Sequence, residues 1–278
     1  MKKALKALAL GTLLAAAPTA QATPSTTYWT PATTYVQPYL VPHVTYDTYV
    51  SERSAMQNDY GLTVGVLPFD KIQGEVGVDS FMPGIAENNL YANAKLALPE
   101  GAFADWQPGV SAGVYGLGFK SDVSNFDVLH AEIGKTLPFV GNLVLGGYYG
   151  LNSKLMVSSS GARQQAGVMG AWTSPDIVVN RTGLNKINFI ADVQSGKNAF
   201  GAVGAGIGVY FTPSIDILTG PVYFFDPNAT SQIAGPGFGT AVRPSWLWTV
   251  QLDVDFDLRA APPAPAAPAV PAQTPKAP

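Results

Sequence analysis

Apolar and polar side chains alternate along most of the last folded stretch of the chain. Because successive side chains of a β-strand point to opposite faces, this alternation predicts a strand with one apolar and one polar face. The apolar face would hold Trp246, Trp248, Val250, Leu252, Val254, Phe256 and Leu258. The opposite face would hold Leu247, Thr249, Gln251, Asp253, Asp255 and Asp257, which are polar from Thr249 onward. A soluble sandwich could carry one such strand, so the fold depends on whether the pattern recurs.

The pattern recurs along most of the chain, and we expect twelve strands. They lie near residues 34–50, 61–67, 72–81, 89–98, 109–119, 126–136, 142–151, 164–173, 185–194, 201–211, 214–225 and 245–258. Every second connection contains a proline, and we expect turns at Pro68, Pro99, Pro138, Pro175 and Pro213. The other connections include the long ones. Short turns on one side and longer loops on the other are typical of barrels in the bacterial outer membrane.

Composition agrees with a membrane barrel. Charged residues make up 13% of the chain, about half of the ~25% usual in soluble domains. Residues 23–278 contain no apolar run of the length that a membrane-spanning helix needs. An open sheet edge in hydrocarbon would leave backbone groups unpaired, so the sheet has to close. We therefore predict an all-β fold, a closed antiparallel transmembrane β-barrel of about 12 strands over residues 34–258.

The polar face of these strands is rich in carboxylates, which we assign to the lumen. The acidic lumen residues are Asp47, Glu75, Asp79, Glu132, Asp192, Asp216, Asp253, Asp255 and Asp257. The other lumen residues are His43, Lys95, His130, Lys186, Tyr39, Tyr91, Tyr115 and Tyr210. Carboxylates that line a water-filled channel favour cations. A plugged lumen, in which the acids pair with lysines or bind water, is the alternative.

The two ends of the chain differ in composition from the barrel. Residues 1–22 carry a basic start, an apolar stretch and the small-x-small sequence Ala20-Gln21-Ala22, which is typical of a signal peptide. We expect residues 23–33 to form a periplasmic segment. Residues 259–278 are mostly proline and alanine and predict a disordered tail, either a spacer or a contact with the cell wall.

Several short stretches resemble small Gram-negative outer-membrane β-barrel proteins of unassigned activity. They are Tyr91-Ala-Asn-Ala-Lys95, Gly134-Lys-Thr-Leu-Pro138, Gly146-Gly-Tyr-Tyr-Gly150, Ser195-Gly-Lys-Asn-Ala199 and Leu218-Thr-Gly-Pro-Val222. The resemblance implies a place in the outer membrane and carries no catalytic residue. One departure is that such barrels usually end at the last strand, whereas a proline- and alanine-rich tail follows here.

Few residues could support catalysis or hold a cofactor. The chain has no cysteine and two histidines, so it offers no thiolate metal site. His130 and Glu132 lie two apart on one face and could contact each other, most simply in a lumen hydrogen-bond network. The glycines between Gly201 and Gly208 resemble a dinucleotide-binding sequence, but no helix pattern follows them. We predict no cofactor and no enzymatic activity.

These features together favour a narrow diffusion channel in the outer membrane, with both termini in the periplasm. We expect it to contact membrane lipid and to pass small hydrophilic solutes, cationic or neutral, with mild cation preference. A plugged structural or tethering barrel of the envelope is the alternative, and a lipid-acting barrel enzyme is a third possibility. The formal net charge of −3 does not suit nucleic-acid binding.

Overall fold

The structure is a computed structural model that describes residues 26–51, 57–85, 88–229 and 245–259. The predicted signal peptide (residues 1–22) and almost all of the predicted tail lie outside these residues. The strands of the described part are β1 Pro42–Val50, β2 Gln57–Gly65, β3 Gln73–Ile85, β4 Asn88–Leu98, β5 Gly109–Gly118, β6 Val128–Leu137, β7 Gly141–Gly150, β8 Ala166–Thr173, β9 Ile177–Arg181, β10 Leu184–Gln194, β11 Ala202–Thr212, β12 Ile215–Phe224 and β13 Trp246–Asp255.

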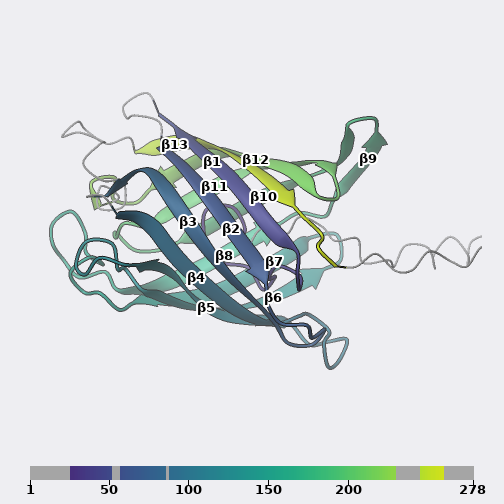
Figure 1. The fold of residues 1–278 in the computed structure, drawn as a ribbon, viewed down its shortest axis with the longest axis horizontal. Helices are drawn as coiled ribbons and strands as arrows, with labels where there is room; N and C mark the ends of the chain where they lie inside the picture. The colour runs from purple at the N-terminus through teal and green to yellow at the C-terminus, as the bar shows by residue number, and fades with distance from the viewer. Residues whose placement is uncertain (1–25, 52–56, 86–87, 230–244, 260–278) are drawn as a thin grey trace, which may run out of the picture.

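The sheet closes on itself into an antiparallel barrel (Figure 1). Consecutive strands pair from β1 to β8, and β8 then pairs with β10, which continues the wall through β11 and β12 to β13. The seam is formed by β1 and β13, which pair from His43 opposite Asp255 to Val50 opposite Trp248. Twelve strands therefore form the wall, as predicted, and β9 is an additional strand. Closure leaves no strand of the wall with an unpaired edge, as a lipid environment requires.

The strand β9 corrects one predicted turn. We expected the chain to reverse at Pro175, but it continues past this proline into β9 and turns only at Thr182 and Gly183. The backbone of Gly183 has a φ of 81°, a conformation that glycine adopts at little cost. The hairpin of β9 and β10 extends beyond the wall at the end of the barrel from which β13 leaves (Figure 1). We call this end the turn end and the opposite end the loop end.

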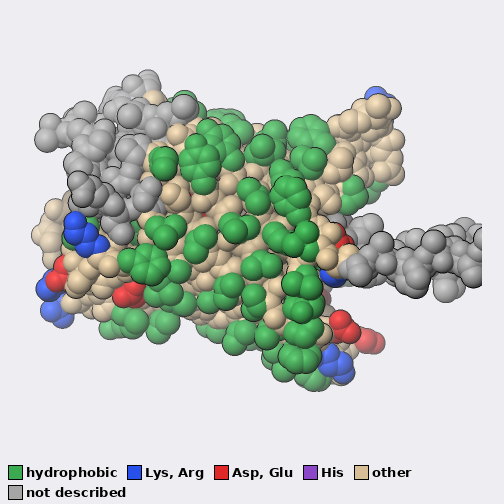
Figure 2. Space-filling model, in the orientation of Figure 1, with side chains coloured by type: hydrophobic (Ala, Val, Ile, Leu, Met, Phe, Trp, Pro, Cys, Tyr) green, Lys and Arg blue, Asp and Glu red, His purple; other side chains and the backbone are tan. Residues whose placement is uncertain are grey.

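The outer surface of the wall is apolar. Large exposed apolar side chains occur on every strand of the wall; they include Val44, Leu62, Val76, Leu96, Val110, Ile133, Leu145, Val168, Phe189, Ile207, Tyr223 and Leu252. Figure 2 shows hydrophobic side chains distributed over the middle of one face, while the charged side chains visible on that face lie towards the two ends. No helix among the described residues is long and apolar enough to span a membrane.

The first two strands begin at different residues from those we expected. We expected strand structure from residue 34, but β1 begins at Pro42, and β2 begins at Gln57 instead of residue 61. The residues before Pro42 alternate without forming a strand of the wall. This part of the chain folds into the barrel, where Val36 and Gln37 are buried. Tyr39, which we assigned to the lumen, is 39% exposed.

Candidate functional site

The interior of the barrel holds most of the polar residues that we assigned to the lumen. The buried ones are His43, Glu75, Tyr91, Lys95, His130, Glu132, Lys186, Asp192, Tyr210, Asp216, Asp253 and Asp255. Asp47, Asp79 and Tyr115 are half-buried. Strand alternation places them inside, because their neighbours in sequence face outward. The closed barrel therefore encloses a surface that is polar and strongly acidic.

Asp257 is the exception among the predicted lumen acids. It follows the end of β13 and is exposed, and its carboxylate lies 2.6 Å from the guanidinium of Arg259. This hydrogen-bonded guanidinium lowers the pKa of Asp257 to about 2. Asp257 thus carries charge outside the lumen and provides a control position for experiments on the lumen acids.

Several interior charges are paired with each other. Lys95 Nζ lies 3.6 Å from Glu75 Oε1, and Lys186 Nζ lies 2.8 Å from Asp176 Oδ2 on the chain between β8 and β9. His43 bridges two carboxylates of β13, with Nε2 3.2 Å from Asp253 and Nδ1 2.9 Å from Asp255. Pairing of this kind is what allows charges to be buried.

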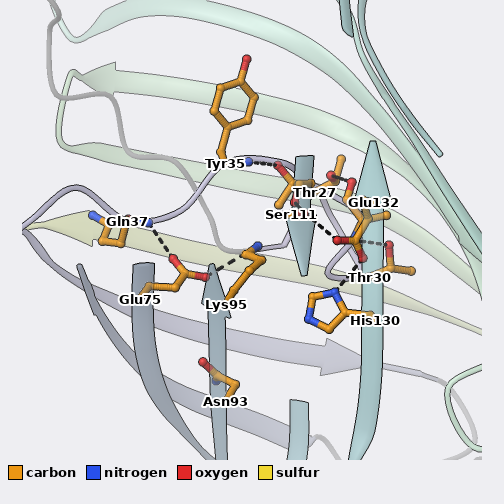
Figure 3. Close-up of polar contacts among 12 residues, drawn as sticks. Thr27, Thr30, Tyr35, Gln37, Glu75, Asn93, Lys95, Ser111, His130 and Glu132 are labelled. Carbon is orange, nitrogen blue, oxygen red and sulfur yellow. Dashed lines mark hydrogen bonds and ion pairs between the residues drawn. The ribbon is translucent and has the colours of Figure 1, made fainter. Parts of the chain in front are cut away.

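Glu132 joins two neighbouring strands through its carboxylate. It accepts a hydrogen bond from Ser111 Oγ at 2.6 Å and lies 2.6 Å from His130 Nδ1, as Figure 3 shows. The contact between His130 and Glu132 is the one that their spacing suggested. The serine hydroxyl donates to the carboxylate and not to the histidine, so this arrangement lacks the serine–histidine contact of a nucleophilic site.

Residues 26–41, which we call the inner segment, cross the interior of the barrel. We expected residues 23–33 to lie outside the barrel, but Tyr28, Thr30 and Thr33 are buried within it. Asp192 Oδ2 on β10 accepts hydrogen bonds from the backbone N–H groups of Tyr28, Trp29 and Thr30, at 3.1, 2.8 and 2.8 Å. Three N–H donors on one carboxylate compensate its burial and fix the start of the segment.

Further hydrogen bonds hold the inner segment to the other walls of the barrel. The backbone oxygen of Tyr28 accepts from Gln251 Nε2 on β13 at 2.9 Å. Gln37 donates its backbone N–H to Glu75 at 2.6 Å (Figure 3). Its side-chain amide donates to Asp255 at 2.8 Å. The segment therefore joins β10 and β13 to β3, through acidic residues that we had assigned to an open lumen.

Glycines of the wall make room for the inner segment. A Cβ atom at Gly204 would lie 2.6 Å from a ring carbon of Tyr28, and one at Gly206 would lie 2.8 Å from the same ring. Near the turn end, a Cβ atom at Gly109 would lie 2.7 Å from Thr34 Oγ1. The repeated glycines of β11, which on paper resemble a nucleotide-binding sequence, instead accommodate an aromatic ring.

Substituting Gly204→Leu is expected to expel the start of the inner segment, because the leucine side chain would occupy the space of the Tyr28 ring. The chain has no cysteine, so Thr30→Cys supplies a single thiol at a position that is 0% exposed. The rate of maleimide labelling at this position should rise strongly with Gly204→Leu. Ala205→Leu is the control, because Ala205 is exposed on the opposite face. Equal labelling rates in both variants would contradict the seating of the segment.

Loops fold over the interior on the side of β5 to β8. Phe126, Met156 and Ala199 come from three connections at the loop end and belong to one buried apolar cluster. Phe200 stacks edge-on against Phe126, with ring centroids 5.0 Å apart, and against Tyr115 at 5.2 Å. The interior on this side is therefore filled by packed side chains.

The interior wall of β1 to β4 is more accessible. Thr45, Asp47, Asp79 and Asn93 face the interior from this wall and are half-buried. Asp59 lies among them with 6% of its surface exposed. Sequence reasoning missed Asp59 because it placed residues 51–60 in a loop; the alternation of Asp59, Gly61 and Thr63 was the available signal. Among the acidic residues that we assigned to the lumen and that face the interior, Asp47 and Asp79 are the most exposed.

Within the described residues, no group of three or more His, Cys, Asp and Glu side chains could hold a metal ion. No protein-family model matches the chain, and no curated protein matches it in sequence. Among solved structures it is similar to an outer-membrane channel from Pseudomonas putida F1, with 12% identity and a TM-score of 0.44 over 80% of this chain and 97% of that one. The NanC porin matches at 12% identity with a TM-score of 0.49, over 78% of this chain and 100% of the other.

A porin of Rh. blastica matches less well, at 10% identity and a TM-score of 0.35 over 72% of this chain and 55% of that one. The first of the three proteins is described as an outer-membrane channel and the other two as porins. Similarity this distant carries no information about solute or mechanism, so the function has to be argued from the barrel itself.

Proposed function

We propose that this chain is an outer-membrane channel for small hydrophilic solutes, with a mild preference for cations. The observation that carries the proposal is the orientation of the two faces of the barrel. An apolar surface surrounds the wall on the outside, and carboxylates line the inside. In a soluble barrel the opposite arrangement would be expected, because burying charged groups costs free energy that burying apolar groups does not.

The proposed route runs along the interior wall of β1 to β4. Asp47 and Asp79 are half-buried there, and no Lys or Arg side chain in the described part of the chain forms an ion pair with either of them or with Asp59. Carboxylates without paired cations attract counter-ions from water, more strongly where low-dielectric walls surround them. The inner segment narrows the route and accounts for a small channel instead of an open pore.

The proposal places the turn end, including the end of β13, in the periplasm. Outer-membrane barrels have short periplasmic turns and longer outer loops. Three of the four connections of two or three residues, those after Leu137, Arg181 and Thr212, lie at the turn end; the fourth, after Ile85, lies at the loop end. The much longer connection between Gly150 and Ala166 also lies at the loop end. Membrane lipid would contact the apolar outer surface, and the proline- and alanine-rich tail would start in the periplasm.

Neutralising Asp47 and Asp79 together as Asp47→Asn and Asp79→Asn is expected to reduce cation selectivity. Each carboxylate near the route attracts a cation by about 1 kcal/mol or more, so the preference for K⁺ over Cl⁻ should fall several-fold. The reversal potential across a planar bilayer with a KCl gradient measures it. Asp257→Asn should leave the potential unchanged, because Asp257 is outside the lumen. Anion preference in the unmodified protein would refute the proposed selectivity.

A plugged structural barrel of the envelope is the second candidate function. The inner segment favours this second function, because it lies inside the barrel. Its hydrogen bonds to Asp192, Glu75 and Asp255 hold it there. Such a barrel would give no conductance in the same bilayer experiment. Deleting residues 260–278 would then change the mechanical properties of the envelope, if the tail contacts the cell wall.

A further inference from the structure

Each of three carboxylates on the accessible wall has an aromatic side chain beside it. Asp47 accepts a hydrogen bond from the hydroxyl of Tyr49 at 3.1 Å. Asp59 on β2 pairs across the sheet with Phe81 on β3. Asp79 on β3 pairs with Tyr91 on β4. Acidic and aromatic side chains thus alternate over four neighbouring strands.

The three carboxylates are close to one another as well. Asp47 lies directly opposite Asp59 in the pairing of β1 with β2, and directly opposite residues in an antiparallel pair have Cβ atoms about 5 Å apart. Asp59 interacts electrostatically with both Asp47 and Asp79. Phe81 and Tyr91 form an edge-to-face pair with centroids 5.6 Å apart, and both rings also pack in the buried apolar cluster that contains Phe126. We call these six side chains the acidic–aromatic cluster.

Two buried polar atoms of the cluster have no partner. Asp59 Oδ1 and Tyr91 Oη form no hydrogen bond, although the two residues are only 6% and 4% exposed. The hydroxyl of Tyr91 and the carboxylate of Asp59 are near enough to interact electrostatically. Buried polar groups in folded proteins are almost always hydrogen-bonded, and leaving a charged one unpaired is costly. Asp59 Oδ1 therefore lacks a hydrogen-bond donor, and none of the six side chains of the cluster carries a positive charge.

We propose that the acidic–aromatic cluster binds the ammonium group of a small organic cation. An ammonium group supplies several N–H donors for carboxylate oxygens, and the faces of aromatic rings attract it as well. A directly ligated metal ion fits less well, because no three acidic side chains in the described residues form a metal-holding group. This inference names the solute class of the proposed channel, and it rests on that function only for the route by which the solute arrives.

Binding can be measured without conduction, on the full mature protein in detergent. Equilibrium dialysis with radiolabelled methylammonium at constant ionic strength should give saturable binding of one cation per chain. Asp59→Asn should weaken the affinity by about tenfold or more, because it removes a charge-assisted hydrogen bond. Phe81→Leu should weaken it several-fold with every carboxylate retained. Asp257→Asn, which removes an exposed carboxylate outside the barrel, should bind as the unmodified protein does.

Three results would overturn the assignment. They are uptake that never saturates, equal competition by NaCl and by unlabelled methylammonium, and an Asp59→Asn protein that binds normally. If Asp59→Asn does not fold, Asp79→Asn at the half-buried position of the cluster replaces it. Binding without conductance would refute the channel and keep the cluster as a binding site. Conductance without saturable binding would refute the cluster and keep the channel.

Discussion

Removal of the inner segment is expected to raise the single-channel conductance several-fold. A chain that begins at Gln37 lacks most of the residues that cross the interior, including Tyr28 and Thr30 on Asp192. A wall of twelve strands lies between small barrels filled by side chains and open porins of sixteen strands, so its interior depends on what fills it. Refolding the shortened and the mature chains in detergent and recording both in planar bilayers measures the change.

The control for this truncation is deletion at the other end of the chain. A protein that lacks residues 260–278 keeps every strand of the wall, because β13 ends at Asp255. Its conductance should equal that of the mature chain. If the truncation that begins at Gln37 also leaves conductance unchanged, then the packed loops around Phe126 and Phe200, and not the inner segment, limit passage.

A charge in the middle of the apolar outer surface is expected to destabilise the barrel in lipid. Leu145 lies near the middle of β7 and is 63% exposed. Leu145→Arg should lower the free energy of unfolding from a bilayer by about 2–4 kcal/mol, because the guanidinium would sit near the bilayer midplane. Urea titration of the protein folded into lipid vesicles, followed by tryptophan fluorescence, measures this difference.

Phe139→Arg is the matched control for this substitution. Phe139 is fully exposed in the turn between β6 and β7, at the level where the membrane meets water. The cost of an arginine there should be only about 0–1 kcal/mol. Equal costs at the two positions, or no cost at either, would show that the apolar surface does not face lipid.

The wall of the barrel was predictable because each strand separates two environments. Along β13, the alternation from Trp246 to Asp255 distinguishes the side chains that face outward from those that face the interior. The other strands of the wall also have apolar side chains on the outer face. The predicted inward positions follow from the same period, so nearly all of them lie inside. The strand count was correct for the same reason.

The contents of the barrel were not predictable in the same way. Tyr35, Gln37 and Tyr39 alternate as a strand would, yet their backbone turns inward and contacts Glu75 and Gly65. Nothing local distinguishes the two outcomes, because the deciding partners lie between 26 and 218 residues away in sequence. The predicted turn at Pro175 was wrong for another reason. The strands before and after this proline, β8 and β9, both pair with the same edge of β10. A proline can therefore interrupt the pairing along this edge without reversing the chain.

The inner segment also constrains the order in which the chain is assembled. Its hydrogen bonds reach Asp192 on β10 and Gln251 and Asp255 on β13, whereas its own C-terminal end continues directly into β1. Contacts between residues so distant in sequence form late, since the entropy of closing long loops is lost first. The inner segment can therefore complete its hydrogen bonds only when β10 and β13 are in place, so its seating is tied to the closing of the seam between β1 and β13.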